Sequence, residues 1–174
     1  FIYTKYTNTY SEITNTSSPN IDSGTIIVSG NSIGTFDKTI QFTSLSKGTK
    51  YKYKAFALND ASLNNLGNEI IFTTLVGIPT TAVLTYNNQI LKLDNVSIEN
   101  NDSNISEHGM LWSTNNTTIP PINSIDRVLV SHPPSTSIET ATIILTPGTT
   151  YYVWVFVKNE AGYSYSTPYS ITIV

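Results

Sequence analysis

An internal repeat constrains the fold of this 174-residue chain more than any other feature of its sequence. Residues 45–59, LSKGTKYKYKAFALN, align with residues 145–159, LTPGTTYYVWVFVKN, at an offset of 100, and six of the fifteen positions are identical. Further upstream, Phe1–Thr4 aligns with Met110–Ser113 at an offset of 109. Whatever fold is assigned to one copy must therefore suit the other copy as well.

The two offsets differ by nine, so the first copy has nine additional residues between its two aligned blocks. The stretch from Lys5 to Ser23, rich in Thr, Asn and Ser, is where we expect them. The second copy also has a segment ahead of its first block that is long enough for two strands, and the first copy has none before Phe1. We therefore expect an incomplete domain at 1–75, without its first two strands, and a complete domain at 76–174. The missing strands would come from upstream sequence or from another chain.

Strand-forming residues dominate the chain, and turn residues interrupt them every 8 to 12 positions or so. No window has the apolar spacing of an amphipathic helix. Alternating or strand-rich segments occur at residues 24–29, 39–43, 51–57, 82–86, 90–98, 109–113, 127–131, 140–145, 150–158 and 169–173. Short strands at regular spacing predict an all-β chain folded as β-sandwiches or barrels.

The repeated block Leu-x-x-Gly-Thr-x-Tyr, followed by alternating residues and an Asn, resembles the end of strand E and strand F of fibronectin type III domains. The segment 105–114, ISEHGMLWST, followed by Pro120, is similar to strand C of the fibronectin type III-like repeats in surface proteins of Bacteroidetes. The resemblance covers both copies. It implies tandem fibronectin type III-like (immunoglobulin-like) β-sandwiches in an extracellular, cell-surface or secreted protein.

A tyrosine opens the alternating strand of each copy, Tyr51 in the first and Tyr151 in the second. Each follows a turn that contains a glycine, at Gly48 or Gly148, where a backbone position without a Cβ is useful. A tyrosine at this place can bury its ring and return its hydroxyl to the turn backbone, as in a tyrosine corner. We expect each hydroxyl to bond a backbone group of residues 47–49 or 147–149.

The opposite face of the strand at 150–158 is unusually aromatic. If Tyr151 faces the core, strand alternation sends Tyr152, Trp154 and Phe156 to the other side. An exposed strip of this kind could stack on sugar rings or contact a surface protein. Alternatively, neighbouring strands or another domain cover these rings. Whether Met110 and Trp112, or instead Leu111, face the core is open.

Composition excludes several classes of function. The 26 Thr, 20 Ser and 18 Asn leave only 12% charged residues and a net charge of −3, with Arg127 as the single arginine. A nucleic-acid-binding domain needs a basic stripe. No run is long and apolar enough to insert into a membrane. The chain has no cysteine, and His108 follows Glu107 on the opposite face of a strand, so we expect no metal, no cofactor and no catalytic residues.

These observations predict a structural or adhesive spacer within a longer extracellular or cell-surface protein or filament. Its partners would be neighbouring domains of the same chain, like subunits in a filament, or a glycan or surface protein. The alternative is a carbohydrate- or protein-binding module, either an accessory domain of a secreted enzyme or part of a virion fibre. Sandwich folds carry all of these functions, so the fold alone does not separate them.

Overall fold

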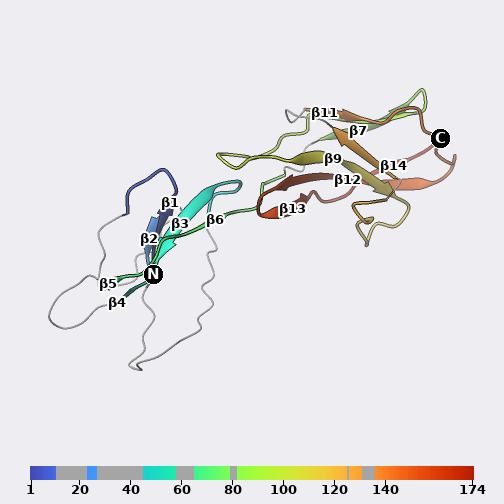
Figure 1. The fold of residues 1–174 in the computed structure, drawn as a ribbon. Coiled ribbons are helices and arrows are strands. Elements are labelled where there is room, and N and C mark those ends of the chain that lie inside the picture. The colour runs from blue at the N-terminus through green and yellow to red at the C-terminus, as the bar shows by residue number, and fades with distance from the viewer. Residues whose placement is uncertain (11–22, 27–44, 58–64, 79–81, 125, 131–135) are drawn as a thin grey trace. The chain divides into compact units, whose positions relative to one another are not determined.

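The chain divides into two compact units, Phe1–Thr74 (unit 1) and Leu75–Val174 (unit 2) (Figure 1). All regular elements of the described residues are strands, and none of these residues belongs to a helix that could cross a membrane. The computed structural model describes residues 1–10, 23–26, 45–57, 65–78, 82–124, 126–130 and 136–174.

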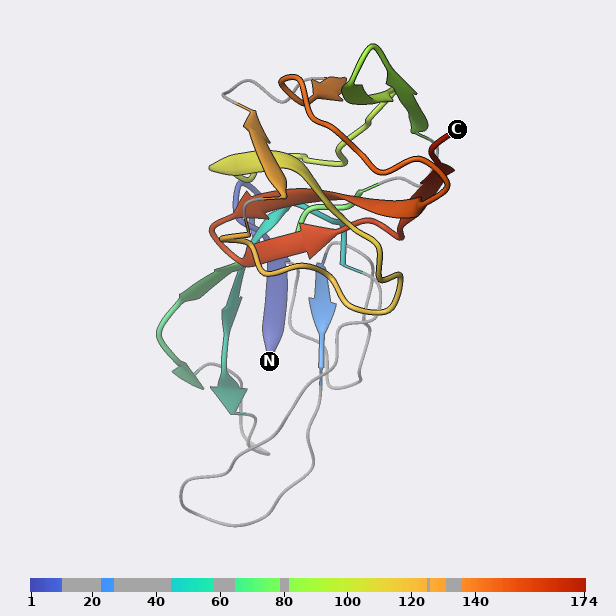
Figure 2. The same cartoon turned by 90° about the vertical axis from the view of Figure 1, so that its right-hand side faces the viewer.

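Unit 2 is a β-sandwich of two antiparallel sheets, which appear as separate layers in Figures 1 and 2. The smaller sheet has the order β11–β8–β7, and the larger has the order β10–β9–β12–β13, with β14 pairing with the first part of β12. This arrangement confirms the predicted fibronectin type III-like sandwich. The strands are β7 (Val83–Asn87), β8 (Ile90–Asp94), β9 (Glu107–Ser113), β10 (Arg127–Val130), β11 (Ser137–Glu139), β12 (Thr150–Asn159), β13 (Gly162–Tyr165) and β14 (Tyr169–Thr172).

The core of unit 2 lies between its two sheets. Alternate residues of β9 and β12 point into it, because successive side chains of a strand point to opposite faces. Met110 and Trp112 therefore face the core and Leu111 faces away from it, which settles the orientation that the sequence left open. The buried residues of this core are Leu91, Leu93, Val96, Met110, Trp112, Ile138, Leu145, Val153, Val155 and Ile173.

The prediction of a strand at residues 140–145 is wrong. The strand of this region is β11, which ends at Glu139. Just beyond it, the Thr140 N–H donates to the Leu91 carbonyl at 3.0 Å, and the Leu91 N–H donates to the Thr140 side-chain hydroxyl at 3.0 Å. This hydroxyl replaces a backbone acceptor, so the regular ladder stops there, and Ile144 is exposed. The predicted strands also do not include β13.

Unit 1 contains one four-stranded antiparallel sheet in the order β2–β1–β3–β6 and a two-stranded pair, β4–β5, within the described residues. The predicted strand at 39–43 lies outside the described residues, as does residue 27 onward of the strand predicted at 24–29. The strands are β1 (Ile2–Lys5), β2 (Ser23–Thr25), β3 (Lys50–Lys54), β4 (Phe56–Ala57), β5 (Asn65–Leu66) and β6 (Ile70–Thr73).

The central strand pairs of the two units, β1–β3 and β9–β12, have the same register. The two sequence offsets relate these pairs. Adding 109 to the residue numbers of β1 and 100 to those of β3 gives the residue pairs of β9 with β12. The matching pairs are Ile2–Lys54 with Leu111–Trp154, Tyr3–Tyr53 with Trp112–Val153, and Thr4–Lys52 with Ser113–Tyr152. The sequence repeat is therefore also a repeat of strand pairing.

The pairing also locates the nine additional residues of unit 1. Ile2 pairs with Thr25, 23 positions further on, whereas Leu111 pairs with Arg127, 16 positions further on. Seven of the nine residues therefore lie between β1 and β2, largely in the expected stretch. The other two lie between β2 and β3, because Thr25 precedes Lys54 by 29 positions and Arg127 precedes Trp154 by 27.

The two tyrosines that open β3 and β12 bond to the backbone in the same way. The Tyr51 hydroxyl accepts from the Ser46 N–H at 3.0 Å, and the Tyr151 hydroxyl accepts from the Thr146 N–H at 3.2 Å. The donor lies five residues upstream in both units, one residue before the ranges expected from the sequence. In each turn the glycine has a positive φ, 54° at residue 48 and 74° at residue 148, which residues with a Cβ rarely adopt.

Replacing Tyr151 by Phe should lower the free energy of unfolding of unit 2 by about 1 kcal/mol, because the Thr146 N–H loses its acceptor. Both tryptophans of the chain, Trp112 and Trp154, lie in unit 2, so fluorescence in a urea titration reports on this unit alone. Tyr152→Phe, on the opposite face of the same strand, is the control. A loss below about 0.3 kcal/mol for Tyr151→Phe would show that the hydrogen bond contributes little.

Candidate functional site

The aromatic strip predicted on β12 does lie on the face opposite the core. Val153 and Val155 are completely buried members of the core, and Tyr151 packs against it. Tyr152, Trp154 and Phe156 alternate with these residues along β12 and lie on the other side of the sheet. There Trp154 pairs with Leu111 and Phe156 pairs with Gly109, both on β9.

This face of β12 is nevertheless covered. Only 2% of Trp154 and 0% of Phe156 is accessible to solvent, and Tyr152 alone keeps a half-buried side chain. A ring must present a face to stack on a sugar or on a partner side chain. Trp154 and Phe156 are therefore not the exposed contact surface that the sequence suggested, and the alternative of covered rings describes them correctly.

Two neighbours explain the burial of Phe156. The ring of Phe156 lies over Gly109, where an added Cβ would be 2.9 Å from two ring carbons, and it makes an edge-on contact with Tyr163 at 6.3 Å between centroids. In Figures 1 and 2 the segment between β9 and β10 runs along the side of the larger sheet that is turned away from β7, β8 and β11. At its end, Arg127 Nη1 donates to the Ile122 carbonyl.

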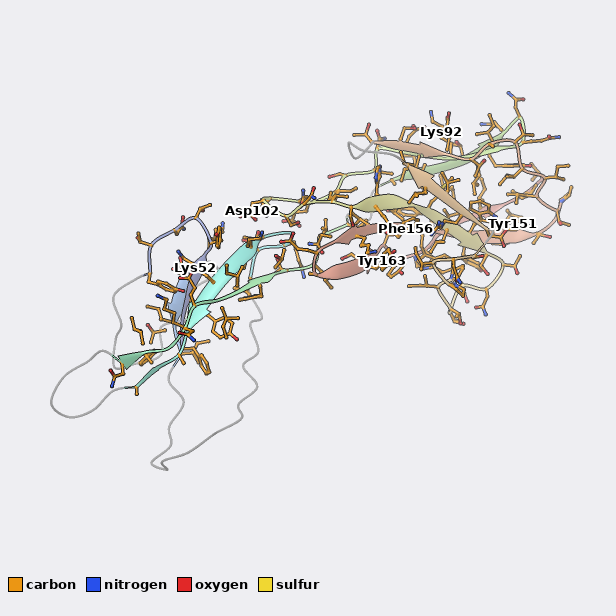
Figure 3. All side chains as sticks on the ribbon, viewed as in Figure 1. Lys52, Lys92, Asp102, Tyr151, Phe156 and Tyr163 are labelled. Atoms are coloured by element: carbon orange, nitrogen blue, oxygen red, sulfur yellow. The ribbon has the colours of Figure 1, made fainter. Side chains whose placement is uncertain are left out.

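A polar cluster borders these rings on the same face of unit 2 (Figure 3). Lys158 Nζ lies 3.0 Å from Glu107 Oε1, and the Tyr163 hydroxyl donates to Glu107 Oε2 at 3.0 Å. The Lys158 ammonium also lies 4.9 Å from the centre of the Tyr163 ring, which stacks on Tyr165. Neither Tyr163 nor Tyr165 is among the residues predicted from the sequence, although their alternation in the segment GYSY is a strand signal.

The ion pair of this cluster shifts the pKa of both partners. The hydrogen bond from Lys158, with a smaller contribution from Tyr163, holds the pKa of Glu107 below its ordinary value of 4.5. The hydrogen bond to Glu107 raises the pKa of Lys158 above 10.5. Both groups are thus kept charged at neutral pH. An acid–base catalyst needs a pKa moved toward neutrality, so these shifts indicate a structural pair.

The equivalent face of unit 1 has a different surface, which we call the Lys–Tyr strip: Lys50, Lys52 and Lys54 of β3 with Tyr6 and Tyr10. The three lysines are alternate residues and lie on one side of the strand, about 7 Å apart. The Tyr6 ring lies 5.8 Å from Lys50 Nζ and 5.9 Å from Lys52 Nζ. The Tyr10 ring lies 5.2 Å from Lys52 Nζ and 5.3 Å from Lys54 Nζ. The two rings therefore separate three like charges by cation–π contacts.

One carboxylate anchors the end of the Lys–Tyr strip. The Tyr10 hydroxyl donates to Glu69 Oε2 at 3.1 Å, and Lys54 Nζ lies 3.9 Å from the same oxygen. Burial and this hydrogen bond raise the pKa of Tyr10 to about 12, so its hydroxyl stays protonated. Tyr6, which is 44% exposed, leaves part of its ring open to solvent. The strip combines positive charge with a partly exposed aromatic ring.

The other polar residues that could have served in catalysis or metal binding, His108, Glu107 and those of the loop 99–104, make structural contacts. His108 is fully buried, while the neighbouring Glu107 bonds to Lys158 and Tyr163 on the other face of β9. In the loop 99–104, Ser103 bonds to Asn100 and accepts from Asn159. Among the described ranges of the chain, no three His, Asp or Glu residues come together in a way that could hold a metal ion.

The chain was compared with protein families, curated proteins and solved structures. No protein-family model and no curated protein sequence matches the chain. The chain is similar to the crystal structure of the chicken CNTN1 FN1-FN3 domains, at 18% sequence identity and a TM-score of 0.39. The similarity covers 78% of this chain and 46% of that one, so the chain spans less than half the length of CNTN1 FN1-FN3. The fold assignment rests on the strand pairing described above.

Replacing Glu107 by Gln should remove part of the acid sensitivity of unit 2. A carboxylate whose folded pKa is lowered contributes stability above its ordinary pKa, here 4.5, and loses it as the pH falls through the folded pKa. We therefore expect the native protein to lose more stability than Glu107→Gln in urea titrations, followed by tryptophan fluorescence, as the pH falls from neutral to below 4.5. Equal losses in the two proteins would contradict a role of the ion pair in stability.

Proposed function

We propose that residues 1–174 are a structural and adhesive spacer of a longer extracellular protein, of the kind found on bacterial surfaces. The observation that carries the proposal is the recurrence of one sheet register in two consecutive units of the same chain. Repetition of a folded unit lengthens a protein without adding new chemistry. Neighbouring domains, or like subunits in a filament, would be the natural partners of such a segment.

The construction of unit 2 supports a mechanical role. β12 is held on both sides, by the seven paired residues of β9 and by β13 and β14. Both faces of β12 are buried between Val153 and Val157, so pulling on the chain has to disrupt a packed core and a hydrogen-bonded ladder together. The abundance of Thr, Ser and Asn keeps the surface polar with few charges, in line with an extracellular setting.

Single-molecule stretching of residues 1–174 tests the spacer function. Unit 2 should unfold in one step with a gain in contour length of roughly 300 Å, since each residue of an extended chain spans up to about 3.5 Å. Gly109→Ala should weaken or abolish this step, because the added Cβ would lie 1.9 Å from the Val128 carbonyl oxygen. Gly67→Ala is the control, because the nearest atom to its added Cβ, Ala55 Cβ, would lie at an ordinary contact distance of 3.5 Å. Smooth extension of the native chain without a step would contradict the proposal.

The Lys–Tyr strip supports a second function, the binding of an acidic polysaccharide by unit 1. The carboxylates of such a chain would pair with Lys50 and Lys52, and a sugar ring would pack on the exposed part of Tyr6. Neutral glycans lack the charge that the strip would recognise. This function is compatible with a spacer, which would then hold a surface polymer as well as extend the chain.

Binding to polygalacturonate, with dextran as the neutral comparison, tests the second function. Lys52→Gln should weaken binding to polygalacturonate about three- to fivefold, the effect of one exposed charge pair, and added salt should weaken it further. Lys92→Gln, which removes a lysine of β8 in unit 2, is the matched control (Figure 3). Equal affinity for dextran and polygalacturonate, or equal effects of the two substitutions, would contradict the role of the strip.

A further inference from the structure

Asn-x-Ser/Thr, the acceptor sequence of N-linked glycosylation, occurs six times in the chain. Its number alone carries little information, because Ser and Thr fill 46 of the 174 positions. The structure is more informative, since five of the six asparagines are among the described residues and have different local environments. The six are Asn15, which lies outside the described residues, and Asn95, Asn101, Asn104, Asn115 and Asn116.

Asn115 lies in the segment that joins β9 to β10, two residues after the end of β9, and Asn115, Asn116 and Thr117 are all exposed. The Thr117 N–H donates to Asn115 Oδ1 at 2.9 Å, and the Thr117 hydroxyl donates to the same oxygen at 2.8 Å. The Asn115 N–H in turn donates to the Ser113 hydroxyl oxygen at 3.1 Å, which ties this turn to the last residue of β9. The third residue of the acceptor sequence is thus bonded, through both of its donors, to the side chain of the first.

These two hydrogen bonds bear directly on the chemistry of glycan transfer. In this reaction Asn115 Nδ2 forms a bond to the anomeric carbon of a sugar, and the bond from that carbon to a pyrophosphate oxygen breaks. The electron pair of the broken bond leaves with the pyrophosphate, and the proton lost from Nδ2 passes to a base of the transferase. An amide nitrogen is a poor nucleophile, because its lone pair is delocalised onto the amide oxygen. Donors on Oδ1 stabilise the negative charge that this oxygen gains as Nδ2 loses its proton, so they assist the step.

The acceptor sequence that begins at Asn101 is arranged differently. The hydroxyl of its third residue, Ser103, donates to Asn100 Oδ1 and accepts from Asn159 Nδ2 at 3.2 Å. Ser103 and Asn159 are only 6% and 2% exposed. This hydroxyl therefore belongs to a buried polar contact, and a transferase would have to open the loop to reach it.

The acceptor sequences that begin at Asn95 and Asn104 are held to the sandwich through their middle residues. Val96 and Ile105 are 3% and 4% exposed, and both belong to hydrophobic clusters of unit 2. In the segment between β9 and β10 the middle residue is Asn116, which is exposed. A transferase can therefore enclose the sequence in this segment without removing a residue from a core.

We propose that Asn115 is the acceptor of an N-linked glycan, transferred from a lipid-linked oligosaccharide pyrophosphate. Such donors serve proteins that are exported, so the inference rests on the extracellular location in the proposed function. Thr117 supplies the two donors to the amide oxygen, and Ser113 is a positioning residue that holds the turn. Asn116 is an exposed neighbour with an overlapping acceptor sequence, so it provides an internal comparison.

Glycan transfer in vitro tests the proposal on folded protein of residues 1–174. The protein is incubated with a purified oligosaccharyltransferase that accepts Asn-x-Ser/Thr and with its lipid-linked oligosaccharide, and the occupancy of each site is followed by mass spectrometry. We expect Asn115 to receive most of the glycan, ahead of the other acceptor asparagines of unit 2.

Ser113→Ala leaves the acceptor sequence intact but removes the hydroxyl that holds the Asn115 N–H. It should slow transfer to Asn115 about three- to fivefold, the effect of one hydrogen bond, and Ser113→Thr, which keeps a hydroxyl, should restore the rate. Ser124→Ala is the matched control, because the Ser124 hydroxyl accepts from the Asp126 N–H at 3.2 Å in the same way at the other end of the segment. It should leave the rate at Asn115 unchanged.

Three results would overturn the proposal. Absence of glycan on the folded chain would show that Asn115 is not an acceptor. Occupancy of Asn101, Asn104 or Asn116 equal to or above that of Asn115 would show that the turn gives no preference. Equal rates for the native protein, Ser113→Ala and Ser124→Ala would show that Ser113 does not position the turn. The stretching response of the chain depends on none of these results, so failure of the glycan site is distinguishable from failure of the spacer function.

Discussion

The pairing between the two central strands, β1 with β3 and β9 with β12, is the constraint on which the rest of both units depends. Strand side chains alternate with a period of two, so a shift of one residue would send Val153 and Val155 outward and Trp154 and Phe156 into the core. The turn before β12 fixes this register, because the positive φ of its glycine and the hydroxyl of Tyr151 position the first residue of the strand. The same turn precedes β3, which explains why the two units share one pairing pattern.

Outside this shared frame the two units diverge, and their differences decide what each can do. On the outer face, unit 2 buries Trp154 and Phe156 beside a structural ion pair, whereas unit 1 has lysines separated by tyrosine rings. On the inner face, unit 2 has a closed core, whereas Ile70 and Ala55 of unit 1 remain exposed. One sheet pattern thus supports a unit with a closed core and a unit whose described residues leave Ile70, Ala55 and part of Tyr6 exposed.

The sequence was sufficient where local pattern determines structure. The Gly-Thr-x-Tyr block and strand alternation predicted the sandwich class and the opposite faces of Val153 and Trp154. It was insufficient where contacts join distant segments. No local signal indicates that Phe156 is covered by Gly109 and Tyr163, or that Tyr10 inserts between Lys52 and Lys54. The false strand at 140–145 has a similar cause, because its apolar residues suit a strand while the Thr140 hydroxyl takes the bond that would have continued one.

The two units share one strand register, but the described core-facing residues Tyr53 and Ala55 of unit 1 are less buried than Val153 and Val155, their counterparts in unit 2, and amide hydrogen exchange of monomeric protein tests this difference most directly. Protection follows the free energy of the opening that exposes each amide, so packed core strands exchange most slowly. We expect the amides of β9 and β12 to exchange at least about a hundredfold more slowly than those of β1 and β3. Equal protection of the two strand pairs in a confirmed monomer would contradict it.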